Sequence, residues 1–500
     1  MDTLSDEVWD VLIAGTSLPE SLLALSLSRS GKKVLHVDRH RYYGGEDAAL
    51  SLQDAEDWAQ ELQQSPSQVF RHASIVKPPD LTGALATSRS YTLSLNPQII
   101  YAKSEFLPTL VSSRIHTQLE FLAVGSWWVL RNETLHKIPS TREDVFNDES
   151  LSMKDKRGLM KFLRYVLQED EDTAASSADD DATMSLKEAV TTKFKIPESL
   201  QAPLLALALS PVAADSIPFD KALARIRRHM RSMGYFGPGF GAVIPKYGGN
   251  SEISQVACRA QAVGGGVYLL GQGLKSRPEL RSDGDTTWVE STLSDGTQIR
   301  SHHLAIAPDD IPSAESSEDL KSSSNTWRSI NVVANPLSSL FPPTSDGGPN
   351  PAVAIVLVED SATGPTNNPV YLQIHSEDTG ECPAGQCIIY ASVTSEDQGS
   401  KGRLQDASSA FLQALDIAGS VLWSMSFRIS GPSANNMHLP PSEEALSSKL
   451  LRFESRPHDI TLDDSVLDRV KDAWEAILGA GVAADSTFMR FEERESELED

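Results

Sequence analysis

Two short apolar runs near the N-terminus flank a leucine-rich stretch with the composition of a buried helix. The first run covers residues 11–14 and is followed by Gly15, and the second covers residues 34–37 and is followed by Asp38. Short apolar runs bounded by turn residues are typical of buried strands, and a longer apolar stretch between them is typical of a helix. The pattern therefore predicts a strand–turn–helix–strand unit of the dinucleotide-binding type.

The glycines with which such a unit holds a nucleotide are mostly missing. The fingerprint is Gly-x-Gly-x-x-Gly, but only Gly15 is present, because Ser17 and Glu20 occupy the other two positions. A carboxylate at Glu20 would repel a diphosphate at the N-terminus of the following helix, where anions bind. We therefore expect a flavoprotein-like α/β fold that carries no flavin, and we expect no other cofactor and no metal.

Downstream patterns divide the chain into a discontinuous α/β domain and an inserted helical domain. Residues 1–139 and 234–500 are assigned to the α/β domain, and residues 140–233 to the all-helical insert. Strands are expected near 266–270, 351–359, 369–375 and 386–394, and a hairpin is expected at 286–299. Residues 303–307 are expected to form a strand that returns to the sheet of the N-terminal unit. Helices are expected near 184–195, 198–209, 218–233, 405–426 and 464–478, and residues 53–80 are expected to form a short helix and a polar loop.

Composition restricts the classes of function. The chain has 500 residues and a net charge of −25, which disfavours nucleic acid and stable adsorption to anionic lipid. An uninterrupted apolar run of membrane-spanning length is lacking, and the acidic N-terminus does not have the form of a signal peptide. The three cysteines, Cys258, Cys382 and Cys387, are expected to be reduced thiols. We expect a cytoplasmic protein that associates with membranes only transiently.

Two motifs carry a family resemblance. The first is Tyr42-Tyr43-Gly44-Gly45-Glu46, in which Glu46 adds another carboxylate near the expected diphosphate position. The second begins at Tyr247 and reads YGGNSEISQVACR, ending at Arg259. Together they resemble the superfamily of Rab GDP-dissociation inhibitors and Rab escort proteins. The second motif has one extra residue after Tyr247 and serines at two positions where the superfamily has glycine and proline.

The resemblance implies a binding surface for GDP-bound Rab GTPases. It carries that role to Tyr43, Glu252, Gln255 and Arg259, with Arg89 as a further candidate. Glu252 and Arg259 are seven residues apart, so both can point from one face of a helix. From spacing alone, an internal ion pair on a solvated helix face is the better explanation of the same two residues.

Two other segments resemble the escort-protein branch. Phe146 and Arg157 have the spacing with which that branch docks the α subunit of the Rab geranylgeranyltransferase heterodimer. They share a helical face if the helix between them is unbroken, but Ser152-Met153-Lys154-Asp155 also has the form of a helix start. The segment 375–386 resembles one that the inhibitors lack, and no chemistry is evident in it.

The resemblance implies a non-catalytic protein that presents Rab to the transferase, shields the attached geranylgeranyl groups and delivers the product to a membrane. The aliphatic segment 200–209 is a candidate for lining the lipid groove, although core packing explains its composition as well. A Rab GDP-dissociation inhibitor is the first alternative, and a flavin-dependent amine oxidase is the second. Ser17, Glu20 and Glu46 argue against the oxidase.

Overall fold

The structure is a computed structural model. It describes residues 3–64, 67–78, 84–139, 152–168, 184–284, 286–312, 325–344, 348–359, 368–395, 397, 399–431, 449–456, 458–479 and 488–491.

A mostly parallel sheet contains the N-terminal unit that the sequence predicts. β1 (Val8–Ala14) pairs in parallel with β2 (Val34–Asp38) on one side and with β13 (Gln298–Ile306) on the other. The described strands lie in the order β10-β2-β1-β13-β12-β11, and β19 also pairs with β13. The remaining members are β10 (Val267–Leu270), β11 (Glu279–Asp283), β12 (Thr286–Thr292) and β19 (Leu450–Arg452). The expected return of residues 303–307 to this sheet is confirmed.

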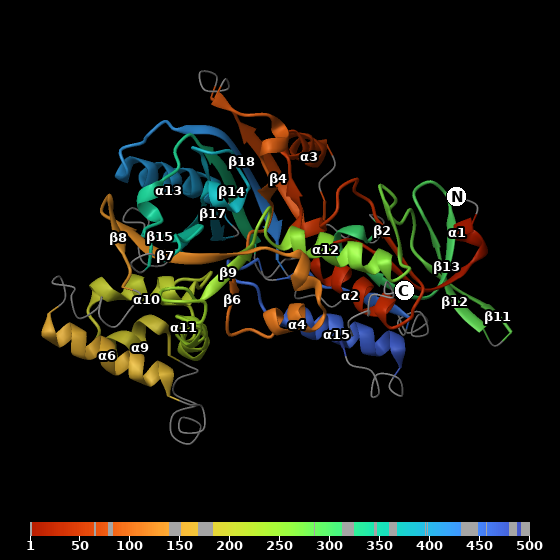
Figure 1. The fold of residues 1–500 in the computed structure, drawn as a ribbon, viewed down its shortest axis with the longest axis horizontal. Helices are drawn as coiled ribbons and strands as arrows, with labels where there is room; N and C mark the ends of the chain where they lie inside the picture. The colour runs from red at the N-terminus through yellow and green to blue at the C-terminus, as the bar shows by residue number, and fades with distance from the viewer. Residues whose placement is uncertain are drawn as a thin grey trace, which may run out of the picture.

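Three helices pack together beside this sheet (Figure 1). They are α2 (Leu18–Arg29), α12 (Asn250–Val263) and α15 (Ser465–Leu478). α2 is buried along almost its whole length, and its leucines share one apolar core with residues of α12 and α15. The Leu-rich composition between β1 and β2 follows from this position, because a helix with no solvent face needs no polar stripe.

A larger, mainly antiparallel sheet forms the other half of the molecule. Its described strands lie in the order β4-β18-β14-β17-β16-β15-β7-β9-β6, and β8 pairs with β7. The bounds are β4 (Phe70–Val76), β6 (Ile100–Tyr101), β7 (Phe121–Arg131), β8 (Thr134–Lys137), β9 (Ala242–Pro245), β14 (Asn325–Val333), β15 (Val353–Val358), β16 (Val370–His375), β17 (Cys387–Thr394) and β18 (Val421–Ser430). α13 (Ser400–Ala414) packs on it, and α3 (Leu52–Gln64) packs on β4.

Two sequence expectations are wrong in this half. The helix expected at 405–426 ends at Ala414, because Asp416 and Gly419 adopt positive φ angles and residues from Val421 onward pair with β14. The polar loop expected after the helix in 53–80 contains β4, which pairs with β18.

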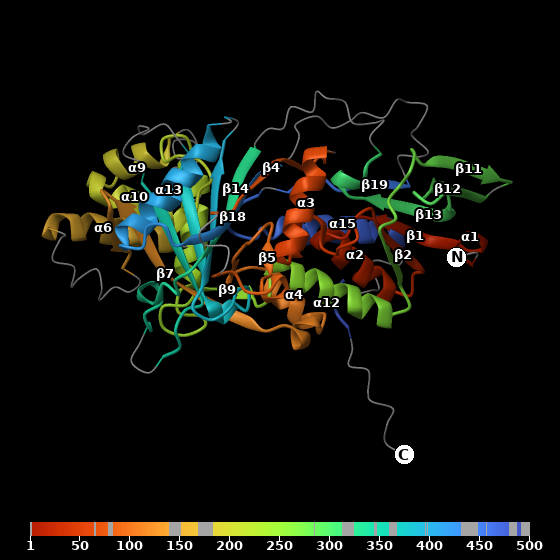
Figure 2. The ribbon, with the colours of Figure 1, turned by 90° about the horizontal axis from the view of Figure 1, so that it is seen from above.

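The described part of the insert is helical. α6 (Met153–Leu167), α9 (Leu186–Thr192), α10 (Gln201–Ala208) and α11 (Phe219–Ser232) surround a core of their own. The apolar face of α6 is buried at Leu159, Phe162 and Val166, whereas Leu167 is exposed. This helical unit lies at the opposite end of the molecule from β11 (Figure 2).

Short elements connect the two halves near α12. β3 (Ala49–Leu50) pairs with β5 (Leu93–Ser94), and the 3-10 turns Ser88–Ser90 and Glu377–Thr379 lie in adjoining loops. Further short helices are α1 (Thr3–Asp6) and α4 (Phe106–Ser112). Within the described ranges, no helix combines the length and apolarity needed to cross a membrane, and no three metal-ligating side chains cluster. All three cysteines are free and buried.

Candidate functional site

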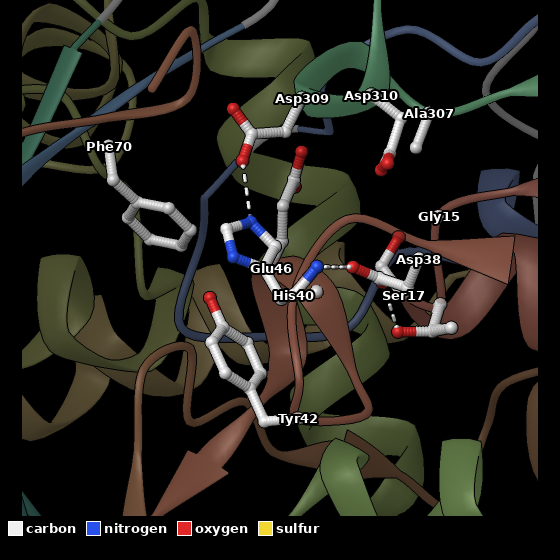
Figure 3. A pocket seen from close by; sticks show the side chains of 12 residues that line it. Gly15, Ser17, Asp38, His40, Tyr42, Glu46, Phe70, Ala307, Asp309 and Asp310 are labelled. Atoms are coloured by element: carbon white, nitrogen blue, oxygen red, sulfur yellow. Dashed lines mark hydrogen bonds and ion pairs between the residues drawn. The ribbon is translucent and has the colours of Figure 1, made fainter. Parts of the chain in front are cut away.

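A small pocket lies at the carboxyl end of β1, where a dinucleotide-binding fold holds its cofactor (Figure 3). Gly15 has a φ of +107°, and a Cβ there would lie 2.3 Å from the Cβ of Ala307, so only glycine fits. The cavity is small, about 20 Å³, and has room for one or two water molecules. Side chains of this chain fill the remaining space.

The N-terminus of α2 already holds an anion from the same chain. The backbone N–H of Leu18 donates to the Asp47 carboxylate at 3.0 Å, and Asp47 forms a buried ion pair with Arg456. The Ser17 hydroxyl donates to the Glu20 carboxylate. Because helix N-termini attract anions, Asp47 occupies the position at which a diphosphate would bind.

The acidic residue at the end of β2 is also satisfied internally. Asp38 accepts hydrogen bonds from the Thr16 hydroxyl at 2.5 Å and from the His40 backbone N–H at 2.7 Å. His40 in turn contacts Asp309 at 3.2 Å, and Asp310 accepts from the Arg39 backbone N–H. Figure 3 shows these carboxylates directed into the same pocket.

Burial raises the pKa of several carboxyl groups in this pocket. Desolvation raises the pKa of Glu46 to about 8 and that of Glu20 to about 7, against the opposing pull of Arg456. Desolvation, with Asp38 and Asp309 nearby, raises the pKa of Asp310 well above its usual range. One oxygen of Glu46, Oε2, is buried and has no hydrogen-bond partner.

These residues do not fit a flavin diphosphate. The sequence argument from charge repulsion at Glu20 and Glu46 needs correction, because burial raises the pKa of both groups and so weakens the negative charge that they present at neutral pH. The physical reason is instead occupation: Asp47 takes the helix terminus, and buried carboxyl groups fill the cavity that phosphate oxygens would need.

A second candidate site is the outward face of α12, which we call the α12 face. It consists of Glu252, Gln255 and Arg259, the residues of this helix between 250 and 260 that are not buried. Glu252 and Arg259 form an ion pair at 3.0 Å, with exposed side-chain fractions of 21% and 53%. The serines that replace glycine and proline, Ser251 and Ser254, point inward and leave this face unchanged.

The internal ion pair does not remove the α12 face as a binding surface. Exposed pairs of this kind contribute about 0–1 kcal/mol to stability, so a partner can displace one at little cost. Gln255 donates to the Ser251 hydroxyl at 3.2 Å, and its side chain is partly exposed to solvent.

Tyr43 lies next to the α12 face but turns its hydroxyl inward. The hydroxyl hydrogen-bonds with Ser21 at 2.9 Å, and the thiol of Cys258 on α12 also lies within hydrogen-bonding reach. Burial raises the pKa of Tyr43 well above its usual range. The half-buried ring is therefore the part of Tyr43 that a partner can reach.

Arg89 lies on a neighbouring exposed loop. It is held in the turn Ser88–Ser90, and the loop continues to Thr92, which packs against the glycine loop before α12. The structure therefore brings Tyr43, Arg89 and the α12 face to one region.

The proposed transferase-docking pair is only half described. Arg157 is exposed on α6, in a row with Lys154, Lys161 and Arg164. Phe146 lies outside the described residues. The helix that carries Arg157 begins at Met153, because the Ser152 side chain accepts the Asp155 N–H in a complete capping box. No helix therefore runs unbroken through Ser152 to Arg157.

The lipid-groove candidate, α10, is packed on both sides. Leu204 and Ala208 belong to the core of the helical unit, whereas Ala202 and Ala206 pack under the larger sheet. Core packing therefore accounts for its aliphatic composition.

Two polar contacts could not be predicted from the sequence. Arg456 pairs with Asp47 across more than four hundred residues, and neither residue belongs to a recognisable motif. The segment 375–386, in which the sequence shows no evident chemistry, contacts the loop that leads into α12.

Comparison with known proteins decides the family. The GDP dissociation inhibitor family matches residues 5–461. The chain belongs to this family. The resemblance of the two sequence motifs is thereby confirmed.

Two relatives within this family are named "Rab proteins geranylgeranyltransferase component A". The protein of Saccharomyces cerevisiae is 31% identical over 417 residues, which is 83% of this chain and 66% of that protein. The protein of Candida albicans is 29% identical over 398 residues, or 78% of this chain and 59% of that protein. The chain thus spans about three-fifths to two-thirds of the length of these relatives.

Solved structures show the same fold. Rab GDI from Plasmodium falciparum superposes with a TM-score of 0.65 and 20% identity, over 94% of this chain and 98% of that one. An oxidoreductase from Methanosarcina mazei gives a TM-score of 0.57 at 13% identity, over 93% and 99%. The expected flavoprotein-like α/β fold is confirmed.

Proposed function

We propose that this member of the GDP dissociation inhibitor family is an escort protein for Rab GTPases. It binds GDP-bound Rab on the α12 face, through Glu252, Gln255 and Arg259, with Tyr43 and Arg89 beside them. It has no catalytic centre of its own and acts as the accessory component of Rab geranylgeranyltransferase. The names of the two fungal relatives support the escort role, since both are component A of that enzyme.

The observation that carries the proposal is that the charged pair Glu252–Arg259 faces solvent while the cofactor pocket is filled. Charged groups that are directional and partly exposed suit charge-assisted hydrogen bonds to a protein partner. The carboxylate-filled pocket beside α2 gives no room to the cofactor on which a flavin oxidase depends.

The transferase heterodimer docks on α6 in this proposal. Arg157 lies within a basic row in a chain whose net charge is −25, so the row presents a local positive surface to the α subunit. Phe146 supplies an apolar contact. The discontinuous domain 1–139 and 234–500 thus binds Rab, and the helical domain 140–233 binds the transferase and the lipid.

The protein then shields the geranylgeranyl groups and carries the modified Rab through the cytoplasm to a membrane, which it contacts transiently. A Rab GDP-dissociation inhibitor remains the alternative function, because a relative from Arabidopsis thaliana that is 27% identical over 78% of this chain is named a guanosine nucleotide diphosphate dissociation inhibitor. Such an inhibitor would bind Rab without meeting the transferase.

Reconstituted prenylation separates these functions. Unprenylated Rab-GDP, the transferase α/β heterodimer and geranylgeranyl diphosphate are combined with and without this protein, and lipid transfer to Rab is followed by mass. An escort protein makes transfer depend on its presence. Rab binding without any support of transfer would identify an inhibitor, and no Rab binding would reject both.

A further inference from the structure

Tyr247 is an exposed aromatic residue in an unfavourable backbone conformation. Half of its surface is open to solvent, and its φ angle is +67°. Residues with a bulky side chain rarely adopt this left-handed region, and they persist there only when surrounding contacts hold them. Tyr247 directly precedes the glycine loop that leads into α12, so its position is linked to the α12 face.

The segment 376–386 supplies the contacts that hold Tyr247. The backbone N–H of Tyr247 donates to the Thr379 carbonyl at 3.0 Å. Its ring lies against Gly380, where an added Cβ would be 2.5 Å from two ring carbons. Gly380 itself has a φ of +71° and therefore gives both the turn and the space for the ring.

A cluster of buried polar side chains holds this segment in place. One oxygen of Glu381 accepts from His375 Nδ1 at 2.9 Å and from the Tyr390 hydroxyl at 2.8 Å, and all three side chains are buried. The carbonyl of Glu381 accepts from the Thr92 N–H at 3.0 Å. The cluster therefore ties the support of Tyr247 to the loop that carries Arg89.

The remaining surroundings of the ring leave its outer side open. The Lys246 ammonium lies 5.0 Å from the ring centroid, but it is engaged in an ion pair with Glu120 at 3.0 Å. An aromatic side chain that is exposed yet held in one place loses little freedom on binding, and such tyrosines are frequent interface hot spots.

We propose that Tyr247 is a fixed aromatic anchor for the protein bound on the α12 face, and that Gly380 and Glu381 are its positioning residues. The occupant is the GDP-bound Rab itself, so the inference rests on the proposed function. The segment 376–386 thereby gains a role: it holds the ring of Tyr247 at the start of the loop that leads into α12.

Two glycine variants give a matched test. Gly380→Ala and Gly385→Ala both place a side chain at a positive φ, +71° and +80°, in the same segment. At Gly380 the new Cβ collides with the Tyr247 ring, whereas at Gly385 nothing lies within 4 Å. Backbone strain is thus common to both, and displacement of the ring is specific to one.

The measurement is the affinity for unprenylated Rab-GDP by titration, with thermal unfolding as a check of folding. Gly380→Ala and Tyr247→Ala are each expected to weaken binding about tenfold or more, and Gly385→Ala by less than about threefold. The double variant Gly380→Ala/Tyr247→Ala should bind no worse than Tyr247→Ala, because Gly380 acts only through the ring. Transferase binding should stay unchanged throughout.

Other outcomes reject the inference separately from the proposed function. If Tyr247→Ala binds Rab-GDP like the wild type while Arg259→Ala does not, the α12 face stands and the anchor fails. If the losses at Gly380 and Tyr247 add in the double variant, Gly380 is not a positioning residue. If Gly380→Ala does not fold, the inference is decided by comparing the Rab-GDP affinities of Tyr247→Ala and Tyr247→Phe. The phenylalanine variant keeps the ring and should bind more tightly than the alanine variant, and equal affinities would reject the anchor. Absence of Rab binding by the wild type overturns the proposed function itself.

Discussion

The pocket at the end of β1 and the α12 face lie on neighbouring helices and treat their charged groups in opposite ways. In the pocket, Asp47 accepts a hydrogen bond from the N-terminus of α2 and pairs with Arg456. Glu46 is buried there, so a partner protein cannot reach it. On α12, Glu252 and Arg259 bind each other at the surface. A cofactor-binding fold therefore serves as a binding protein when side chains of its own chain fill the cleft and one helix face stays available to a partner.

The first prediction is that the pocket excludes flavin. Its failure would remove the contrast between the pocket and the α12 face. The purified protein should release no flavin on denaturation, because Asp47 and the buried carboxyl groups occupy the diphosphate position. The measurement is the visible absorbance of the supernatant after heat denaturation. Stoichiometric flavin would show that the pocket opens and that the α12 face is not the main site.

The next prediction concerns the helical unit. Truncation of an aromatic or arginine hot spot often costs at least about 2 kcal/mol, which is about thirtyfold in affinity. Phe146→Ala should therefore weaken transferase binding about thirtyfold or more, and Arg157→Glu should weaken it in a salt-dependent way. Binding of Rab-GDP should survive both changes, because the α12 face lies on the other domain.

A matched control for Arg157→Glu is Lys221→Glu, which reverses an exposed charge on α11 of the same helical unit. The pair is measured by co-sedimentation with the transferase heterodimer at two salt concentrations. Equal behaviour of the two variants would mean that net charge, and not the basic row on α6, governs the interaction. If Phe146→Ala unfolds the helical unit, Phe146 is a core residue and the docking role is lost.

A further prediction concerns the stability of the pocket and not binding. Glu46 has a folded-state pKa of about 8, raised from about 4.5 by burial, so the folded protein holds a proton there that the unfolded chain releases. Stability contributed by this group therefore falls as pH rises from about 4.5 to about 8, by up to about 1.4 kcal/mol per pH unit. Glu46→Gln removes this loss and should stabilise the protein more at pH 8 than at pH 5.

Chemical denaturation of wild type and Glu46→Gln at the two pH values measures this effect. Glu56→Gln is a suitable control, because Glu56 is only partly buried and pairs with Lys77 near the surface. Parallel stability curves for wild type and Glu46→Gln would show that Glu46 ionises in the folded state like an exposed carboxylate.

Local patterns in the sequence predicted the parts of the site that depend on a few consecutive residues. The unit from β1 to β2 followed from two apolar runs and Gly15, and the spacing of Glu252 and Arg259 placed both on one helix face. The capping box of α6 was readable from Ser152 and Asp155. Each of these depends on interactions within one or two helical turns.

Long-range pairings could not be predicted in the same way. The helix expected at 405–426 overruns the start of the strand Val421–Ser430, because the pairing partners of this strand lie nearly a hundred residues away in β14 and more than three hundred away in β4. The pair Asp47–Arg456 and the support of Tyr247 by Gly380 likewise join residues that share no local pattern. Burial decides the protonation of Glu46, and burial is a property of the fold.

The most direct test of the account is a calorimetric titration of unprenylated Rab-GDP into the wild type and into Arg259→Ala at one fixed salt concentration. Removal of a charge-assisted contact at a protein interface typically costs about 2–5 kcal/mol, so the variant should bind about thirtyfold more weakly or worse. Its unfolding free energy should change by less than about 1 kcal/mol, because the pair with Glu252 is exposed. Equal affinity of the two proteins, or no binding by the wild type, would contradict the account.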